Sequence, residues 1–256
     1  MWDKVAERIE EFIKKKVEEA KANGVVVGIS GGVDSATVAF LSARALGKDR
    51  VLGVIMPEKG VTPEEDIEDA VEVCRILGIG HEVVFINEIV ESFISKLGSN
   101  GVAFANIKPR VRMTILYFFA NKRNLLVAGT GNKSELRVGY FTKYGDGGVD
   151  FLPIGDLYKT EVWELAKYLG VPERIIKKKP SARLWRGQTD EDEIGLSYKK
   201  LDSILKSIES GVPVEKIPEV AGVTKEEVER VLRLIESSRH KRETPPIAPV
   251  RALIDS

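Results

Sequence analysis

The segment GVVVGISGGVDSATVAF, residues 24–40, sets the architecture of this chain. It begins with a short run of β-branched residues, typical of a buried parallel strand, and after Gly31-Gly32 it returns to an apolar helical pattern. Glycines at such a turn let the backbone bend tightly and approach a ligand closely. Because the following helix points its unpaired N–H groups at the same place, we predict a phosphate-binding turn between the strand and the helix.

Asp34 is the unusual residue of this turn, because a carboxylate beside an anion site repels the anion. A cation between the two removes the repulsion, so we predict that Asp34 binds Mg²⁺ and that the metal bridges it to phosphate oxygens. Ser30 and Ser35 add hydroxyl donors. The alternative is a plain strand–helix turn in which Asp34 is an N-terminal helix acid. The complete string favours phosphate binding, although it is neither G-x-x-x-x-G-K-[ST] nor G-x-G-x-x-G.

Strands and helices alternate through the first half of the chain, with short connections, which predicts an α/β fold. We expect a doubly wound, mainly parallel sheet of five strands with helices on both faces. The predicted strands are 25–29, 51–56, 81–86 and 125–129, and the predicted helices are 3–22, 35–46, 88–97 and 107–121. A further helix is expected to begin with Thr62 as its N-cap and Pro63 in its first turn, and to run to Gly78. Segment 98–106 is predicted to be a loop.

The pattern changes at about residue 130. Residues 129–156 are glycine-rich and polar, and a loop of that length inside a compact domain is usually functional. The next helix is expected to present Val162, Leu165, Ala166 and Leu169 on one face, and further helices are expected near 197–209 and 224–236. The tail, 238–256, contains too many prolines to predict a helix. We therefore expect one domain over residues 1–256 with a helical C-terminal extension.

Composition excludes several classes of protein. The 39 basic and 39 acidic side chains of the 256 residues cancel, which argues against a protein built to hold nucleic acid. The single cysteine, Cys74, lies in an apolar helical pattern, so we predict a buried structural thiol and a reducing compartment, the cytoplasm. The charged N-terminus lacks the apolar region of a signal peptide. No apolar run approaches the roughly 20 residues of a membrane span, so we expect no membrane partner.

The string S-G-G-V-D-S after a strand resembles the signature of the ATP pyrophosphatases, which split ATP between its α and β phosphates and adenylate a second substrate. Within that group, the second half of the chain resembles ammonia-dependent NAD synthetases. The motifs that carry the resemblance are NIKPRVRM (106–113), GTGNKSE (129–135), FTKYGDGGVDFLPIGDLYKT (141–160), DEDEIGLSY (190–198) and HKR (240–242). The resemblance covers nearly the whole chain and implies a Rossmann-like, adenine nucleotide alpha hydrolase-like fold. The glutamine-dependent type carries a large amidase domain, for which this chain has no room.

The resemblance implies an ATP site, and the metal site at Asp34 gains Glu135 as a second Mg²⁺ ligand. Two carboxylates at neighbouring strand ends, with phosphate oxygens, suit a hard cation. Lys159 would contact the phosphates as a catalytic residue. The residues expected to bind ATP are Gly28, Ile29, Ser30, Gly31, Gly32, Val33, Asp34, Ser35, Thr130, Lys159 and Ser181.

The implied second substrate is deamido-NAD, a dinucleotide that carries a nicotinic acid carboxylate. Cations suit its pyrophosphate and carboxylate, and an acid suits a ribose hydroxyl. The residues at matching positions are Arg110, Lys143, Asp150, His240 and Lys241. Taken without the resemblance, His240 and Lys241 are more typical of a solvated basic tail. Phe104, Phe141 and Tyr144 suit either ring stacking or the core.

The implied reaction has two steps. The nicotinate carboxylate attacks the α-phosphorus of ATP and pyrophosphate leaves; ammonia then attacks the acyl-adenylate to give NAD and AMP. Asp146 is our candidate for the catalytic acceptor of the ammonium proton, because glycines on both sides let its loop pack closely. The family implies a homodimer with the substrate site at the interface, and the apolar helix 107–121 is a candidate contact. The alternatives are a GMP synthetase-like or tRNA-modifying ATP pyrophosphatase, or a non-catalytic ATP sensor.

Overall fold

The computed structural model describes residues 1–99 and 101–254, and a parallel sheet forms its centre. The described residues form four strands in the order β3-β2-β1-β4, rather than the five expected. Their bounds are Gly24–Gly28 for β1, Val51–Ile55 for β2, Gly80–Val83 for β3 and Leu125–Val127 for β4. Next to β4, the described residues form an isolated parallel bridge from Ala128 to Phe151 in place of a fifth strand. The doubly wound α/β prediction is confirmed.

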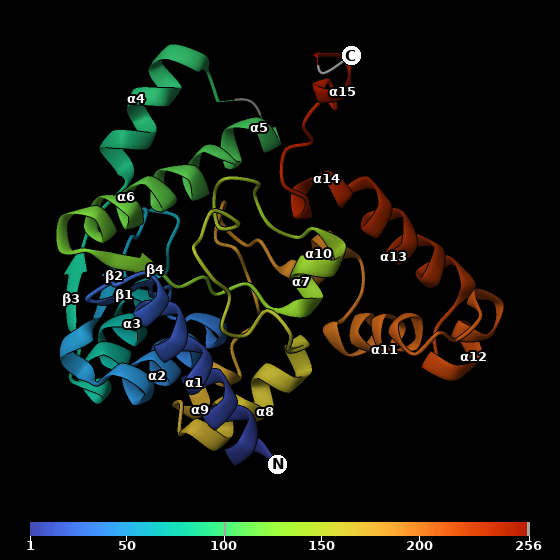
Figure 1. Cartoon of the computed structure of the whole chain (residues 1–256), viewed down its shortest axis with the longest axis horizontal. Helices are drawn as coiled ribbons and strands as arrows, with labels where there is room; N and C mark the ends of the chain where they lie inside the picture. Colours follow the sequence, from blue (N-terminus) through green and yellow to red (C-terminus); the bar gives the residue numbers. More distant parts are fainter. Residues whose placement is uncertain (100, 255–256) are drawn as a thin grey trace.

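Helices cover both faces of the sheet because its strands are apolar on both sides (Figure 1). Val25 and Val27 of β1 belong to the apolar cluster of one face, and Val26, which points the opposite way, belongs to the cluster of the other. The first face carries α1 (Trp2–Glu19), α2 (Val33–Leu46), α3 (Glu64–Leu77), α8 (Lys159–Leu169) and α9 (Glu173–Ile176). The second carries α4 (Asn87–Leu97) and α6 (Ile107–Arg123).

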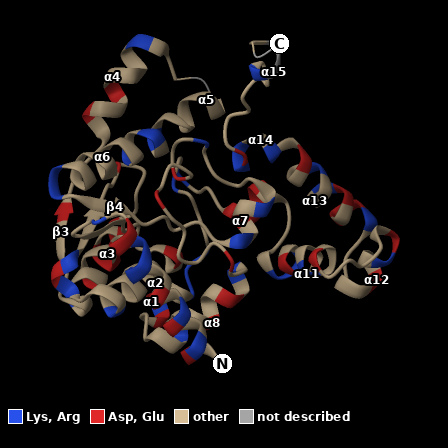
Figure 2. Ribbon diagram, in the orientation of Figure 1, with Lys and Arg blue, Asp and Glu red and all other residues tan. Residues whose placement is uncertain are grey.

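The C-terminal helices form the predicted extension, on the right in Figure 1. They have an apolar cluster of their own, in which Tyr198 and Leu201 are fully buried. The bounds here are α10 Asp190–Ile194, α11 Tyr198–Glu209, α12 Ile217–Ala221 and α13 Lys225–Ser237. Short 3₁₀ turns lie at Lys48–Arg50 and Val214–Lys216. Both acidic and basic residues lie along α1 and α13 (Figure 2).

Four local predictions were wrong. The expected loop 129–156 contains a helix, α7 (Lys133–Val138). The expected loop 98–106 contains a short helix, α5 (Gly101–Ala105), and the expected non-helical tail contains α14 (Arg239–Arg242) and α15 (Arg251–Ile254). At the start of α3, Pro63 rather than Thr62 occupies the N-cap, because the Thr62 hydroxyl instead accepts a hydrogen bond from the Glu58 amide at 3.0 Å.

The strand order creates a crevice at one end of the sheet. After β1 the chain builds β2 and β3 on one side, then returns to place β4 on the other side of β1. Ligands of open α/β sheets bind at such a reversal, outside the carboxyl ends of the strands. Here α2 follows β1 and α7 (Lys133–Val138) follows β4, so both helices begin at the crevice. Among the described residues, no helix has the length and hydropathy needed to cross a membrane.

Candidate active site

A cavity of about 460 Å³ lies at this crevice, a typical volume for a small-molecule site. The turn after β1, the loop after β4, helix α6 and segment 178–193 line it. All of the expected ATP residues line this one cavity: Gly28, Ile29, Ser30, Gly31, Gly32, Val33, Asp34, Ser35, Thr130, Lys159 and Ser181. Glu135, Asp146 and Lys241 line it as well.

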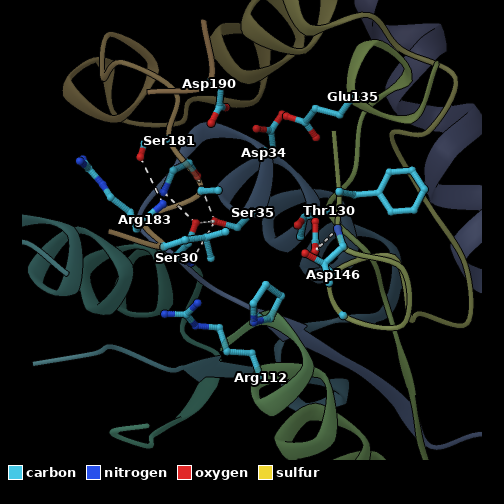
Figure 3. Close-up of a pocket in the computed structure, with 18 of the residues that line it drawn as sticks. Ser30, Asp34, Ser35, Arg112, Thr130, Glu135, Asp146, Ser181, Arg183 and Asp190 are labelled. Atoms are coloured by element: carbon cyan, nitrogen blue, oxygen red, sulfur yellow. Dashed lines mark hydrogen bonds between the residues drawn. The ribbon is translucent and has the colours of Figure 1, made fainter. Parts of the chain in front are cut away.

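Hydrogen bonds to the hydroxyls of Ser30 and Ser35 hold the turn between β1 and α2 (Figure 3). The Oγ atoms of Ser30 and Ser35 lie 3.1 Å apart, and the Gly32 amide donates to Ser30 Oγ at 3.3 Å. Gly31 adopts φ +77°, and a Cβ there would lie 2.2 Å from the carbonyl oxygen of Asp66. A side chain at Gly31 is therefore excluded by conformation and by space. The turn leaves the N-terminal N–H groups of α2 beside the cavity.

Two carboxylates and one ammonium meet across this cavity. Asp34 and Glu135 stand in the first turns of α2 and α7, and Figure 3 shows their carboxylates facing each other. Lys159, the first residue of α8, is only 2% exposed. Its Nζ bonds to Asp34 Oδ2 and lies 3.3 Å from Glu135 Oε1. Three helix N-termini thus deliver the charged groups expected at the phosphates.

Asn132 fixes the position of Glu135. Its side chain accepts a hydrogen bond from the Glu135 amide at 3.1 Å, and Glu135 Oε2 accepts one from the Asn132 amide at 3.3 Å. Asn132 Nδ2 also donates to Asp34 Oδ1 at 3.2 Å. This reciprocal pair is a capping box at the start of α7. The Asn-x-x-Glu spacing is visible in the sequence, so it offered a signal for α7 that our interpretation of 129–156 as a loop missed.

Asp190 is a further site residue that the sequence interpretation missed. Its carboxylate accepts hydrogen bonds from the hydroxyls of Tyr140, at 3.0 Å, and Tyr198, at 3.1 Å. Tyr198 OH also lies 3.3 Å from Glu135 Oε1. Figure 3 shows the Asp190 carboxylate beside that of Asp34. Asp190 therefore joins Asp34 and Glu135 as a third acidic side chain near Lys159, the one basic side chain of this cluster.

The electrostatics of the cluster follow from burial and this excess of acids. Burial raises the pKa of Glu135 to about 8; the charge of Lys159 opposes this shift, and the charges of Asp34 and Asp190 add to it. Burial also raises the pKa of Asp190, again against Lys159. For Lys159 burial acts to lower the pKa, but the surrounding carboxylates outweigh it and raise the pKa. The cluster therefore favours additional positive charge.

Asp146 lies on the opposite wall, below Thr130 in Figure 3. Its Oδ1 accepts a hydrogen bond from the Thr142 amide at 2.8 Å. Burial raises the pKa of Asp146, while its backbone hydrogen bonds and the charges of Lys241 and Arg112 act to lower it. Arg112, another cavity residue absent from our sequence prediction, is held by a 3.0 Å hydrogen bond from its Nε to the Met56 carbonyl. The wall thus combines one carboxylate with two cations.

Most residues expected to bind the second substrate lie outside this cavity. Lys241 lines it and donates to the carbonyls of Gly139 and Phe141, at 2.7 and 2.8 Å. Arg110, Lys143 and His240 are linked beside it. Arg110 Nη2 donates to the Lys143 carbonyl at 3.3 Å, and Lys143 Nζ donates to the His240 carbonyl at 2.6 Å.

Asp150 is separate from that group and helps to end β4. Its Oδ2 accepts a hydrogen bond from the Val127 amide at 2.7 Å, and its Oδ1 accepts one from Tyr117 OH at 3.0 Å. The structure therefore shows a local structural contact for Asp150, next to the strand end that leads into the cavity.

Ion pairs fasten the segment around Ser181 to α3. Asp66, 5% exposed, receives Lys178 Nζ at 2.7 Å and Arg183 Nε at 2.8 Å. Lys178 Nζ also donates to the Gly31 carbonyl at 3.3 Å, which ties the segment to the phosphate turn. On the other side, Lys108 Nζ donates to the Leu184 carbonyl at 2.6 Å. Segment 178–188 is thus held from two sides at the cavity mouth.

Comparison with known proteins places this geometry in a family. The family model described as NAD synthase matches residues 5–245. The NH(3)-dependent NAD(+) synthetase of Archaeoglobus fulgidus is 60% identical over 254 residues, covering 99% of each chain. The solved NH3-dependent NAD synthetase of Campylobacter jejuni, in complex with nitrate, is 35% identical with a TM-score of 0.83, covering 97% of this chain and 99% of that one. The solved NMN synthetase of Francisella tularensis is 34% identical with a TM-score of 0.86 and the same coverage. The chain therefore belongs to the NAD synthase family.

Proposed function

We propose that this protein is an ammonia-dependent NAD synthetase, a ligase that converts deamido-NAD to NAD with ATP and ammonia. Family membership over nearly the whole chain supports this function. The single observation that carries it is the cavity where the turn after β1 faces Lys159, Asp34 and Glu135. ATP binds in that cavity, the deamido-NAD carboxylate attacks its α-phosphorus, and pyrophosphate leaves. Ammonia then displaces AMP from the acyl carbon.

The protein activates ATP by position and charge. The turn amides and the N-terminus of α2 hold the phosphates, as helix N-termini commonly do. Ser181 closes the site from segment 178–188, and Thr130 lies at the adenosine end. Lys159 neutralises the charge that develops on the leaving pyrophosphate. Burial acts to lower the pKa of Lys159, but the charges of the surrounding carboxylates outweigh it and raise the pKa, which keeps the ammonium charged.

The donor set of the cluster fits Mg²⁺ bound jointly with ATP. Among residues 1–99 and 101–254, no group of three or more His, Cys, Asp or Glu side chains is arranged to hold a metal. Asp34 and Glu135 nevertheless place hard carboxylate oxygens close together, since both bond to Lys159 Nζ, and a cation held by the two acids would lie beside that ammonium. A Mg²⁺ ion usually takes one or two protein carboxylates and completes its shell with phosphates and water. Bound by Asp34 and Glu135, the ion would neutralise phosphate charge.

Asp146 takes the proton from ammonium in the second step. Burial raises the pKa of Asp146, which makes its carboxylate a better proton acceptor than a solvated one. Lys241, beside it, faces the same cavity. We assign Arg110, Lys143 and His240 to the more distant part of deamido-NAD, because they cluster beside Lys241, and Asp150 to a ribose or ring contact.

The active unit in this proposal is a homodimer of single-domain chains, with deamido-NAD bound at the interface. Exposed apolar side chains on α4, α5 and α6 support a second copy there: Phe93, Leu97, Val102 and Phe118. We place the enzyme in the cytoplasm, because the lone thiol of Cys74 suits a reducing compartment.

One assay tests the proposed function. The protein is incubated with ATP, Mg²⁺, ammonium and deamido-NAD, and NAD, AMP and pyrophosphate are quantified; we expect the three in equal amounts. The variant Asp34→Asn/Glu135→Gln, which removes both acids, is expected to lose turnover. Full turnover by that double variant would overturn the assigned site.

A second experiment tests whether the substrate is a dinucleotide or a mononucleotide, because an NMN synthetase shares this fold at a TM-score of 0.86. The same assay is run with the corresponding mononucleotide acid and with xanthosine monophosphate. We expect the dinucleotide to give the highest kcat/KM. A preference for the mononucleotide would reassign the substrate, and AMP release without any amidated product would reject a synthetase.

A further inference from the structure

Asp202 of the C-terminal extension bonds to two helices whose first residues lie at the active site. It lies in α11 and is 2% exposed, so its carboxylate needs hydrogen-bond donors from the protein. Ser134 Oγ in α7 donates to its Oδ1 at 2.5 Å, and the Thr160 amide in α8 donates to its Oδ2 at 2.9 Å. One side chain thus bonds to two helices that begin at the cavity.

The two donors stand directly beside the charged residues of the site. Ser134 precedes Glu135, and Thr160 follows Lys159. Ser134 Oγ also accepts a hydrogen bond from the Lys159 amide at 2.9 Å. A continuous chain of hydrogen bonds therefore runs from Asp202 through Ser134 to the backbone of Lys159.

These bonds satisfy groups that α8 cannot satisfy itself. The first N–H groups of a helix have no partner within it, and a carboxylate at that end also stabilises the helix dipole. Here Ser134 takes the amide of Lys159 and Asp202 takes that of Thr160. The origin and direction of the Lys159 side chain are therefore set by residues of α7 and α11.

The relative placement of α7 and α8 decides whether Lys159 and Glu135 meet. Their charged atoms are 3.3 Å apart, and hydrogen bonds and ion pairs weaken steeply when such distances grow. A backbone bond from the Lys133 amide to the Leu157 carbonyl, at 2.8 Å, joins the same two segments just outside the site. Loss of Asp202 therefore loosens the junction without separating the helices.

We propose that Asp202 is a positioning residue of the ATP site. Through its bonds to Ser134 and Thr160 it fixes the relative positions of Glu135 and Lys159, which face the phosphates. This inference rests on the roles of Glu135 and Lys159 in the proposed function. It also gives the C-terminal extension a part in the reaction, because α11 supplies the group that aligns two helices of the α/β core.

The test measures ATP affinity by titration calorimetry with Mg²⁺ present, together with the KM values for ATP and deamido-NAD. Asp202→Asn keeps the size of the side chain but replaces one acceptor oxygen with a donor, so we expect ATP affinity to fall by roughly tenfold. Ser134→Ala is expected to lower it by roughly the same factor. The double variant should add little to either, because both act through one junction. The KM for deamido-NAD should stay unchanged.

Leu205→Ala is the matched control, because Leu205 is fully buried in the same helix. It is expected to lower the melting temperature but to leave ATP affinity within about twofold, since a merely structural defect in α11 acts on stability alone. ATP affinity within about twofold of wild type in Asp202→Asn and Ser134→Ala would overturn the inference, as would an equal loss in Leu205→Ala.

Lys159→Ala separates this inference from the proposed function on which it rests. If Lys159→Ala keeps both ATP affinity and turnover, the assigned site is wrong. If Lys159→Ala loses them while the Asp202 variants do not, only the positioning role fails. Should Asp202→Asn fail to fold, Ser134→Ala removes one end of the same hydrogen bond and gives the decisive measurement.

Discussion

At the scale of the residue, Cys74 shows that a local sequence pattern can predict correctly whether a side chain is buried. Its apolar helical neighbours predicted a buried thiol, and the side chain is fully buried and free. A Cβ on Gly53 would lie 2.9 Å from its sulfur, so the thiol fills the space that the glycine leaves above β2. Burial raises the pKa of Cys74 to about 11, from 9.0.

This pKa shift predicts a dependence of stability on pH. Above pH 9 the unfolded chain ionises the thiol but the folded chain does not, so unfolding releases a proton and the free energy of unfolding falls. The contribution is present below pH 9 and is lost by pH 11, at about 1.4 kcal/mol per pH unit, or roughly 2–3 kcal/mol in all. Urea unfolding between pH 8 and 11 should show a shallower fall for Cys74→Ala. Parallel curves for the two proteins would refute the shift.

Asp146 carries the second prediction at this scale. In Asp146→Asn the side-chain oxygen can still accept the hydrogen bond from the Thr142 amide, so the loop should keep its shape. The amide cannot take a proton, and we expect NAD formation to slow by roughly a hundredfold or more while pyrophosphate release stays within about threefold. Rapid-quench measurement of both products checks this. Asp156→Asn, whose side chain is 98% exposed, is the control, and equal losses in both steps would count against proton transfer.

At the scale of the element, the sequence predicted best where the signal was local. The strand, the glycine turn and α2 follow from consecutive residues, and the structure places the expected ATP residues in one cavity. The missed helix α7 carried a local signal, its capping box, but other missed helices depend on distant partners. For example, α14 forms in a proline-rich tail because Lys241 donates to the carbonyls of Gly139 and Phe141, about a hundred residues earlier in the chain.

Asp190 and Asp202 were hidden from the sequence for the same reason. Asp190 belongs to the site because Tyr140, fifty residues earlier, bonds to it, and Asp202 because Ser134, sixty-eight residues earlier, does. No spacing rule links residues so far apart before the fold is known. The residues that a local motif can name are those that touch the ligand, and the residues that support them come from other elements.

Segment 178–188 offers a prediction at this scale. Arg183→Ala removes one of the two cations on the buried Asp66 and should lower the free energy of unfolding by about 1 kcal/mol. Asp66→Asn removes the carboxylate that Lys178 and Arg183 share, although Lys178 keeps its ion pair with Asp69, and should cost about 2 kcal/mol. Both should speed amide exchange in this segment. Lys177→Ala, which breaks an exposed pair with Glu173 in the neighbouring turn, should change stability by less than about 0.5 kcal/mol. An effect of Arg183→Ala no larger than that control would show that the ion pair does not hold the segment.

At the scale of the whole molecule, three helices on one side of the sheet carry exposed apolar side chains. Phe118 on α6 is 59% exposed, Leu97 on α4 is 70% exposed and Val102 on α5 is 71% exposed. Figure 1 shows these three helices on the same side of the sheet, and α4 and α5 both pack against α6. Exposed apolar patches of this kind commonly mark a protein interface.

We expect this surface to bind a second copy of the chain and Phe118 to lie near the centre of the contact. Phe118→Asp would bury an unpaired charge there and should weaken the dimer by roughly thirtyfold or more, which sedimentation velocity over a range of concentrations measures. Val220→Asp, on the exposed face of α12, should leave the dimer intact. Because deamido-NAD is expected to bind across the interface, Phe118→Asp should also raise the KM for deamido-NAD and leave ATP affinity unchanged. If the wild-type chain sediments as a monomer and is fully active, the dimer interface is not part of the active site and each chain binds deamido-NAD by itself.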